Sequence, residues 1–164
     1  MDILKIYEYA LQREREGRDF FASNASRFGH AAASGVFQKL AEEEEKHITF
    51  IQSLIAALES RGAEGLKVGE DMDKEGFFSE RAEAEMMDQT VIEAMVPDLP
   101  VLRTAYLIER DFAEFYETSA QRVEDEMAKK SLQMLARWER QHEKLFKAMH
   151  DKAFEEYASM PWGG

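Results

Sequence analysis

Apolar side chains recur at steps of three and four residues through most of the chain, which is the period of an α-helix. Four long segments follow this period, at about residues 3–28, 34–61, 98–123 and 125–157. Gly29 and Gly62 follow the first two segments as stop signals. Ser34 is the expected N-cap of the second segment, and Pro100 fits the first turn of the third. Each predicted helix is roughly 35–45 Å long, at about 1.5 Å per residue.

The connections between these segments predict how they are arranged. The first and last connections are short, so segments one and two, and segments three and four, should be antiparallel neighbours. The stretch at about 62–98 is too long for a tight turn, and it is expected to cross over with one shorter amphipathic helix at about 78–95. Two hairpins joined by a long crossover predict an all-α fold, a ferritin-like four-helix bundle. One domain over residues 1–164 is expected, with a tail at about 158–164 that packs on the bundle or on a partner subunit.

Six polar residues interrupt the apolar stripes. Each long helix points one carboxylate toward the core at about the same depth, and two helices add a histidine one turn later: Glu14, Glu44, His47, Glu109, Glu139 and His142. A buried carboxylate without a partner is very costly, and four of them repel one another. Either these groups are protonated, or the stripe is misinterpreted, or cations lie among them. Two divalent cations would neutralise four carboxylates, and Glu-x-x-His places both side chains on one helix face, so the pattern favours a di-metal centre.

The same arrangement of polar residues occurs twice in the chain. The first three of the six residues recur 95 positions later as the last three. The same shift aligns Leu40 with Leu135 and Phe21 with Tyr116. A duplicated helical hairpin explains all these matches together, whereas coincidence does not.

Several neighbouring polar residues have plainer interpretations. In the run of four glutamates that contains Glu44, the other three fall off the stripe and are expected to be solvated: Glu42, Glu43 and Glu45. His30 and His150 lack comparable partners and are interpreted as surface histidines. Glu16 and Glu143 are near the candidate ligands in sequence but point off the stripe, so they are poor candidates.

Two further residues have two interpretations each. Tyr116 lies on the same face as Glu109 and either donates a hydrogen bond to a ligand carboxylate or simply packs in the core. Glu93, in the crossover, is expected to be solvated, with capping of the centre as the alternative.

Composition and charge exclude several classes of function. The chain has 33 Asp and Glu against 21 Lys and Arg, and this net charge of −12 disfavours nucleic-acid binding because it repels phosphate backbones. It has no cysteine, which excludes disulfides, thiolate nucleophiles, Cys-ligated zinc and iron–sulfur clusters. No apolar run approaches the roughly 18 residues that cross a bilayer, and the first residues lack a secretory signal pattern. We therefore expect a cytoplasmic protein with no nucleic-acid or membrane partner.

Four stretches of the sequence resemble the rubrerythrin branch of the ferritin-like superfamily: ALQREREGRDFF, LAEEEEKH, AYLIERDFAEFY and LARWERQH. With their helices they cover about three-quarters of the chain. The resemblance implies a centre of two iron ions, with zinc or manganese as substitutes. It also implies a role for each candidate ligand, namely outer carboxylates at Glu14 and Glu109, bridging carboxylates at Glu44 and Glu139, and nitrogen ligands at His47 and His142.

The sequence departs from the pattern of that family at two points. Rubrerythrins usually carry a C-terminal rubredoxin domain with four cysteines, whereas this sequence has none, so the electron donor is expected to be a separate protein. They also typically have an extra glutamate one turn after the third-helix ligand, where this chain has Phe112. The six-ligand pattern is therefore closer to a symmetric ferritin-like centre.

The resemblance implies a non-haem di-iron oxidoreductase that reduces peroxide or dioxygen, as a peroxidase or a ferroxidase. The alternative is an iron-binding, storage or delivery protein with little catalytic turnover. A third hypothesis is a structural bundle whose metals are adventitious. Long helices with wide apolar stripes also predict self-association, at least as a homodimer.

Overall fold

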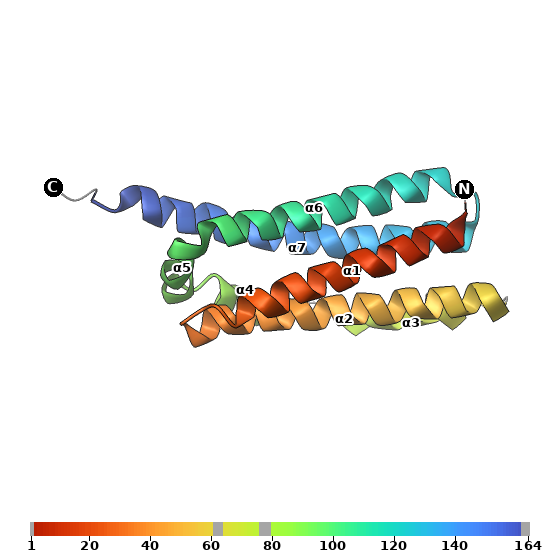
Figure 1. Ribbon diagram of the computed structural model, residues 1–164, viewed down its shortest axis with the longest axis horizontal. Coiled ribbons are helices and arrows are strands. Elements are labelled where there is room, and N and C mark those ends of the chain that lie inside the picture. The colour runs from red at the N-terminus through yellow and green to blue at the C-terminus, as the bar shows by residue number, and fades with distance from the viewer. Residues whose placement is uncertain (1, 61–63, 76–79, 162–164) are drawn as a thin grey trace.

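The chain forms two antiparallel helical hairpins that lie side by side (Figure 1). The structure is a computed structural model, and it describes residues 2–60, 64–75 and 80–161. The four long helices are α1 (Ile3–Ala25), α2 (Ala31–Ser60), α6 (Leu99–Arg122) and α7 (Glu126–Ser159). The connection between the hairpins contains α3 (Glu64–Glu75), α4 (Glu80–Met86), α5 (Gln89–Met95) and a 3₁₀ helix, Val96–Asp98. The described residues contain no strand, and the predicted all-α, ferritin-like four-helix bundle is confirmed.

The helix ends around the first connection differ from the prediction. Helix α1 ends at Ala25, before the predicted end at residue 28. Helix α2 begins at Ala31, earlier than the expected N-cap at Ser34. The reason is the imidazole of His30, whose Nδ1 accepts a hydrogen bond from the amide of Ala32 at 3.2 Å and so satisfies a helix-end donor before Ser34 is reached.

The crossover contains three α-helices within the described residues, whereas the sequence predicted one at about 78–95. The prediction missed α3, which packs against α2 and also contacts α7. Two glycines four residues apart allow this close approach. A Cβ on Gly65 would lie 2.8 Å from the carbonyl oxygen of Ser53. A Cβ on Gly69 would lie 2.5 Å from the ring of Phe50.

Replacing Gly65 with alanine is expected to loosen α3 from α2, because the added methyl group meets backbone rather than a movable side chain. Gly35→Ala, in α2, is the matched control. Nothing lies within 4 Å of its Cβ position, and alanine in a helix is more stable than glycine by roughly 0.5–1 kcal/mol. Amide hydrogen exchange, followed by mass spectrometry, should become faster across α3 in Gly65→Ala and should not in Gly35→Ala. Unchanged exchange across α3 in Gly65→Ala would contradict the close packing.

Two apolar clusters fill the bundle, one on each side of a polar layer. The first includes the stacked rings of Phe21 and Phe146, whose centroids are 5.4 Å apart, together with Phe37. The second includes Phe50 and Trp138. Along each long helix, residues of one cluster precede the buried carboxylate and residues of the other follow it. The fold therefore holds the polar groups in a layer that apolar side chains seal at both ends.

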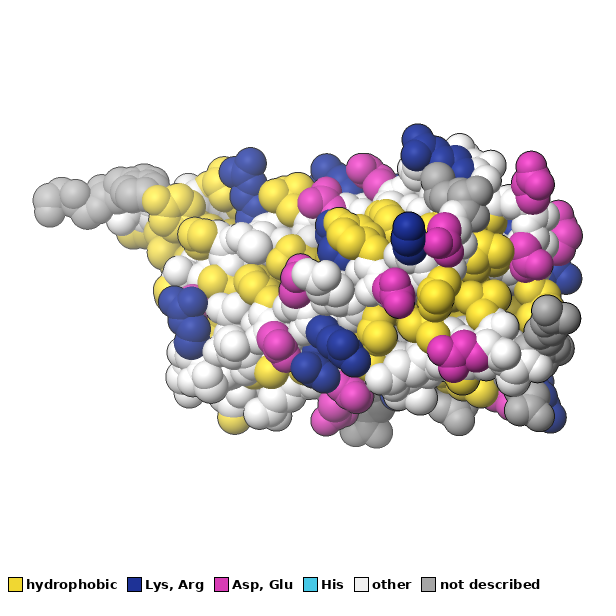
Figure 2. Space-filling view, turned by 45° about the vertical axis from the view of Figure 1, so that its right-hand side comes forward, with side chains coloured by type: hydrophobic (Ala, Val, Ile, Leu, Met, Phe, Trp, Pro, Cys, Tyr) yellow, Lys and Arg dark blue, Asp and Glu magenta, His cyan; other side chains and the backbone are white. Residues whose placement is uncertain are grey.

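The surface is mixed in character. Figure 2 shows one face, on which charged side chains are interspersed with hydrophobic ones. Near the end of α7, which extends past the other long helices (Figure 1), three large hydrophobic side chains are exposed: Phe154, Tyr157 and Met160. The part of the predicted tail that contains Trp162 lies outside the described residues. Among the helices that the structure describes, none is both long enough and apolar enough to span a membrane.

Candidate metal centre

The six predicted polar residues meet in the layer between the two apolar clusters. Helices α1 and α6 contribute one glutamate each, and α2 and α7 contribute a glutamate and a histidine each: Glu14, Glu109, Glu44 with His47, and Glu139 with His142. All six side chains are fully buried. They form two groups of four, in each of which the candidate ligand atoms lie within 4.8 Å of one another. Glu44 and Glu139 belong to both groups, which is the placement that bridging carboxylates require.

Both imidazoles present Nδ1 to the carboxylates. His47 Nδ1 lies 2.9 Å from an oxygen of Glu139 and 3.2 Å from an oxygen of Glu14. His142 Nδ1 lies 3.5 Å from an oxygen of Glu44. Each histidine therefore contacts a carboxylate of the opposite hairpin, so the polar layer joins the two halves of the bundle.

The carboxylates lack the partners that a buried charge needs. Within the part of the chain that the structure describes, no hydrogen bond of good geometry reaches the oxygens of Glu44 or Glu109. Among the same residues, the ion pairs of the four carboxylates involve histidines and no lysine or arginine. Such groups are costly to bury unless a cation neutralises them. Carboxylate and imidazole are also the ligands used in di-iron and di-manganese bundles, so these residues fit a pair of divalent cations.

Burial and mutual repulsion change the pKa values in this layer. Burial raises the pKa of Glu14, and the charges of Glu139 and Glu44 raise it further. The pKa of Glu109 is raised for the same reasons. Burial opposes protonation of His47, but the carboxylates of Glu139 and Glu14 more than offset it and raise the pKa of the imidazole well above its usual value. In the absence of metal the layer therefore holds protons, which cations would replace.

The two shared carboxylates shift in the opposite direction. Burial opposes ionisation of Glu139, but the charge of His47 and contacts with His142 lower its pKa below the usual value. For Glu44, burial and the charge of Glu139 are outweighed by contacts with Glu14 and the histidines, and its pKa is also lowered. The carboxylates common to both groups are therefore the ones that stay ionised.

Comparison with protein families places the chain among known proteins. A family model described as Rubrerythrin matches residues 5–150. The chain belongs to the rubrerythrin family. No curated protein and no solved structure matches it. The matched range covers most of both hairpins and all six buried polar residues, and the resemblance seen in the sequence is confirmed.

Phe112 occupies the position at which the sequence departs from the usual rubrerythrin pattern. Its side chain is buried, and its ring lies 3.1 Å from the position that a Cβ on Gly17 would take. That same Cβ would lie 3.6 Å from an oxygen of Glu44, so Gly17 leaves room for the ring beside the centre. The guanidinium of Arg13 lies over the ring, 4.6 Å from its centroid. An aromatic ring in cation–π contact with Arg13 thus occupies this position beside the centre.

Tyr116 hydrogen-bonds the centre, which settles one of the open interpretations. Its buried hydroxyl donates to Glu14 Oε1. Burial and the neighbouring charge of Glu14 raise the pKa of Tyr116 well above its usual value, so the hydroxyl keeps its proton. The equivalent position in the 95-residue repeat is Phe21, which has no hydroxyl, so the two halves of the centre differ here.

Tyr116→Phe is expected to weaken metal binding while leaving the core filled. The ring remains, but Glu14 loses the hydrogen bond that orients it, and losses of this kind typically reduce metal affinity by about 10–100-fold. Tyr7→Phe is the matched control, since Tyr7 is also buried and hydrogen-bonds Ser131 outside the polar layer. Titration with Co²⁺, followed by absorbance, compares the variants. Equal affinities for Tyr116→Phe and the unaltered chain would show that the hydroxyl does not hold Glu14.

Glu43 corrects the interpretation of the acidic run. Its side chain is buried, and one oxygen pairs with Lys46 at 2.7 Å. The expectation that Glu43 is solvated was wrong because this residue lies four positions before His47 and shares its inward face. Glu42 and Glu45 are exposed, as predicted.

Other residues near the candidate ligands lie outside the two groups. Glu93 is exposed and does not cap the centre. His30 is exposed as expected. His150 is partly exposed, with its side chain 19% accessible and its ring packed against Tyr106. Two glutamates lie outside the groups, as predicted: Glu16 and Glu143.

Trp138 is a neighbour of the centre that sequence reasoning missed. Its indole is fully buried and stacks on the imidazole of His47, with ring centroids 5.2 Å apart. The sequence contained a signal for it. The 95-residue repeat places Glu43 at the position equivalent to Trp138, so the large aromatic side chain immediately before Glu139 departs from the duplicated pattern.

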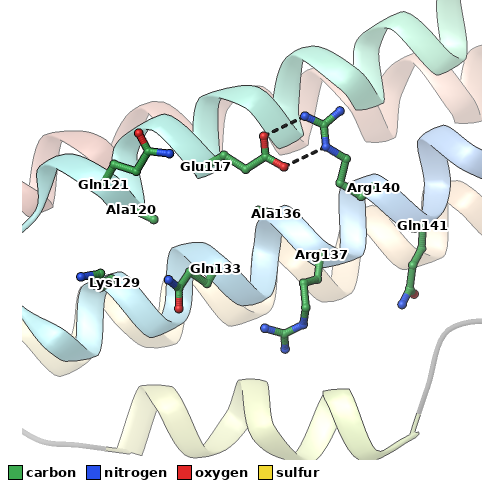
Figure 3. Close-up of a pocket in the computed structure, with 9 residues that line it drawn as sticks. All are labelled: Glu117, Ala120, Gln121, Lys129, Gln133, Ala136, Arg137, Arg140 and Gln141. Carbon is green, nitrogen blue, oxygen red and sulfur yellow. Dashed lines mark hydrogen bonds and ion pairs between the residues drawn. The ribbon is translucent and has the colours of Figure 1, made fainter.

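A groove of about 590 Å³ lies between α6 and α7, and none of the six candidate ligands lines it (Figure 3). Its charged lining residues are three cations and one carboxylate: Lys129, Arg137, Arg140 and Glu117. Glu117 accepts two hydrogen bonds from Arg140, at 2.8 and 2.7 Å. Arg140 also pairs with Glu143, and Arg137 pairs with Asp73, so both arginines of the groove have carboxylate partners.

Proposed function

We propose that this chain is a non-haem di-iron protein that reduces hydrogen peroxide or dioxygen, as a peroxidase or a ferroxidase. One observation carries the proposal: two fully buried Glu/His groups share Glu44 and Glu139. One ion would take Glu14 and His47, and the other would take Glu109 and His142. Both ions would share Glu44 and Glu139. When bound, a pair of ferrous ions supplies two electrons to an oxidant, one from each ion.

The side chains around the centre hold ligands, exclude water and carry protons. The two apolar clusters separate the polar layer from bulk water. Tyr116 fixes the orientation of Glu14 and keeps a proton on its hydroxyl oxygen close to the centre. Burial and the charges of Glu44 and Glu139 raise the pKa of Glu109. Its carboxyl group therefore holds a proton, which the uptake of metal ions would release.

Stopped-flow mixing tests the proposal. Protein loaded with two Fe²⁺ per chain, as checked by element analysis, is mixed with hydrogen peroxide or with oxygen-saturated buffer. A fast rise in ferric absorbance is expected, and the oxidant that gives the faster rise is the better substrate. Absence of any fast change while both irons are bound would contradict a redox function.

Iron storage or delivery is the second candidate, because an acidic surface attracts Fe²⁺. Size-exclusion chromatography separates the two functions, since storage requires a large hollow assembly. We propose a homodimer instead, for which the exposed side chains at the end of α7 offer an apolar surface: Phe154, Tyr157 and Met160. Element analysis of protein isolated from its own host, without added metal, identifies the native ion.

A further inference from the structure

Three aromatic rings form a continuous stack at the candidate metal centre. The indole of Trp138 stacks on the imidazole of His47, with centroids 5.2 Å apart and planes 20° apart. His47 stacks in turn on His142, with centroids 5.5 Å apart and planes 14° apart. Offset stacked rings at these separations are in van der Waals contact. The stack therefore gives a continuous path of π systems from the indole to both candidate nitrogen ligands.

The outer end of the stack reaches the surface through one hydrogen bond. Trp138 Nε1 donates to Asp73 Oδ1 at 3.0 Å, and Asp73 belongs to α3. The side chain of Asp73 is 44% exposed, and its other carboxylate oxygen pairs with Arg137 at 3.2 Å. A buried indole N–H needs an acceptor, and here that acceptor is a carboxylate at the surface. The path from this carboxylate to His47 therefore crosses a single side chain, the indole.

The internal repeat shows that the indole is additional to the ligand set. Trp138 stands 95 positions after Glu43, so the equivalent place in the first hairpin holds a carboxylate, which pairs with Lys46. The duplicated glutamates and histidines thus assemble in both halves whether or not a ring is present at this position. The indole adds a connection to the surface on the His47 side.

A groove lies beside the same surface. Arg137, which pairs with Asp73, also lines the groove between α6 and α7, and Figure 3 shows it extending from α7 toward α3. Both arginines of the groove are paired with carboxylates, Arg137 with Asp73, and Arg140 with Glu117 and Glu143. The sequence contains no cysteine, so a cysteine-bound iron centre would have to deliver electrons from outside it.

We propose that electrons from a one-electron donor enter at the surface beside Asp73 and pass through Trp138 and His47 to the metal centre. This inference rests on the proposed di-iron function. Each transfer oxidises the donor by one electron and reduces one ferric ion to the ferrous state, so two transfers restore both ions. Trp138 is unchanged after each transfer, since it connects donor and centre without forming or breaking a bond. It acts through His47 and is a positioning residue for the electron path.

Fluorescence tests the placement of the indole independently of any turnover. In the Trp162→Phe variant, Trp138 is the remaining tryptophan, and loading with Co²⁺ should quench its emission in step with metal occupancy. Full emission from Trp138 with Co²⁺ bound in the centre would overturn the contact on which the path depends.

The rate of reduction of the ferric centre tests the path itself. Iron-loaded protein is oxidised with ferricyanide, desalted and mixed with photoreduced flavin mononucleotide, an anionic donor. Trp138→Leu, which removes the ring and its N–H, should slow reduction by about an order of magnitude, and Trp138→Phe, which keeps a ring, should lie between. Trp162→Phe should be reduced as fast as the unaltered chain. An unchanged rate of reduction in Trp138→Leu at equal iron content overturns the path. If the leucine variant does not load iron, an unchanged rate in Trp138→Phe overturns it instead.

Because ferricyanide prepares the ferric centre, none of these rates depends on reaction with peroxide. Normal donor reduction without a peroxide or dioxygen reaction would therefore contradict the proposed function and leave the electron path intact.

Discussion

Glu44→Gln is expected to abolish tight binding of both metal ions, although it replaces a single oxygen with an amide nitrogen. Glu44 belongs to both groups of candidate ligands, so the change removes a ligand from each ion. An uncharged amide with one oxygen cannot bridge two cations. Losing only the hydrogen-bond partner of a ligand costs about 10–100-fold in metal affinity, and we expect a larger loss here. Equilibrium dialysis against Co²⁺, with element analysis of the bound ion, measures the effect.

Two further variants make this result specific. Glu45→Gln changes an exposed neighbour in the same acidic run, which pairs with Arg18 at 2.8 Å, and it should bind two ions as the unaltered chain does. Glu14→Gln should lose one ion, because Glu14 belongs to only one group. If Glu44→Gln still bound two ions with normal affinity, Glu44 would not be shared between them.

The convergence of the six polar residues could be predicted because helical phase alone decides which side chains face the core of a bundle. Glu44 and His47 lie one turn apart on an apolar stripe, and the repeat places Glu139 and His142 in the same relation. Short connections then align the hairpins, and the four carboxylates arrive at one depth. Only the lengths of the connections were needed for this step, not their conformation, which is why it succeeded.

The surroundings of the centre depend on contacts that periodicity does not describe. In the sequence alone, the two glycines of α3 indicate a break in the helical pattern. The position of α3 in the structure depends instead on its contacts with Phe50 and Ser53 of α2. The orientation of Trp138 depends on Asp73, which comes from that same helix. Glu43 was misassigned because a stripe drawn through Glu44 and His47 is narrower than the buried face of α2. These errors all concern side chains whose environment is set by the crossover or by the width of a helix face.

The ligands of the centre are duplicated, but their neighbours are not. Three pairs of repeat-equivalent positions differ beside the candidate ligands: Tyr116 and Phe21, Phe112 and Gly17, and Trp138 and Glu43. One half therefore has a hydroxyl on its outer carboxylate and an indole on its histidine, whereas the equivalent positions of the repeat hold Phe21 and Glu43. The two candidate metal positions are thus chemically unequal although their ligand types match.

The metal-free protein is expected to lose stability as the pH rises through neutrality. The pKa values of Glu14 and Glu109 are raised in the folded protein, so their contribution to stability is complete below the ordinary value of 4.5 and is lost as the pH rises through the folded pKa. His47 and His142 also have raised pKa values, and their contribution is lost in the same direction above 6.5. All four groups therefore favour the folded state more at acidic than at neutral pH.

Glu44 and Glu139 set the acid limit of this stability. Their pKa values are lowered in the folded protein, so their contribution is complete above 4.5 and is lost as the pH falls through the folded pKa. Acidification far below 4.5 should therefore destabilise the metal-free protein again. Its free energy of unfolding should be largest at mildly acidic pH and should fall on both sides.

Bound metal is expected to reverse the slope near neutrality, because protons compete with cations for the same ligand atoms. Thermal unfolding between about pH 5 and pH 9, with excess chelator or with Co²⁺, measures both forms, and each 1 kcal/mol shifts Tm by about 2–4 °C for a chain of this size. Glu109→Gln, which cannot ionise, should flatten the metal-free slope, whereas Glu114→Gln, at an exposed position of the same helix, should not. A metal-free Tm that climbs steadily from mildly acidic to alkaline pH would show that the buried layer does not hold protons. In that case the argument that cations replace those protons would fail with it.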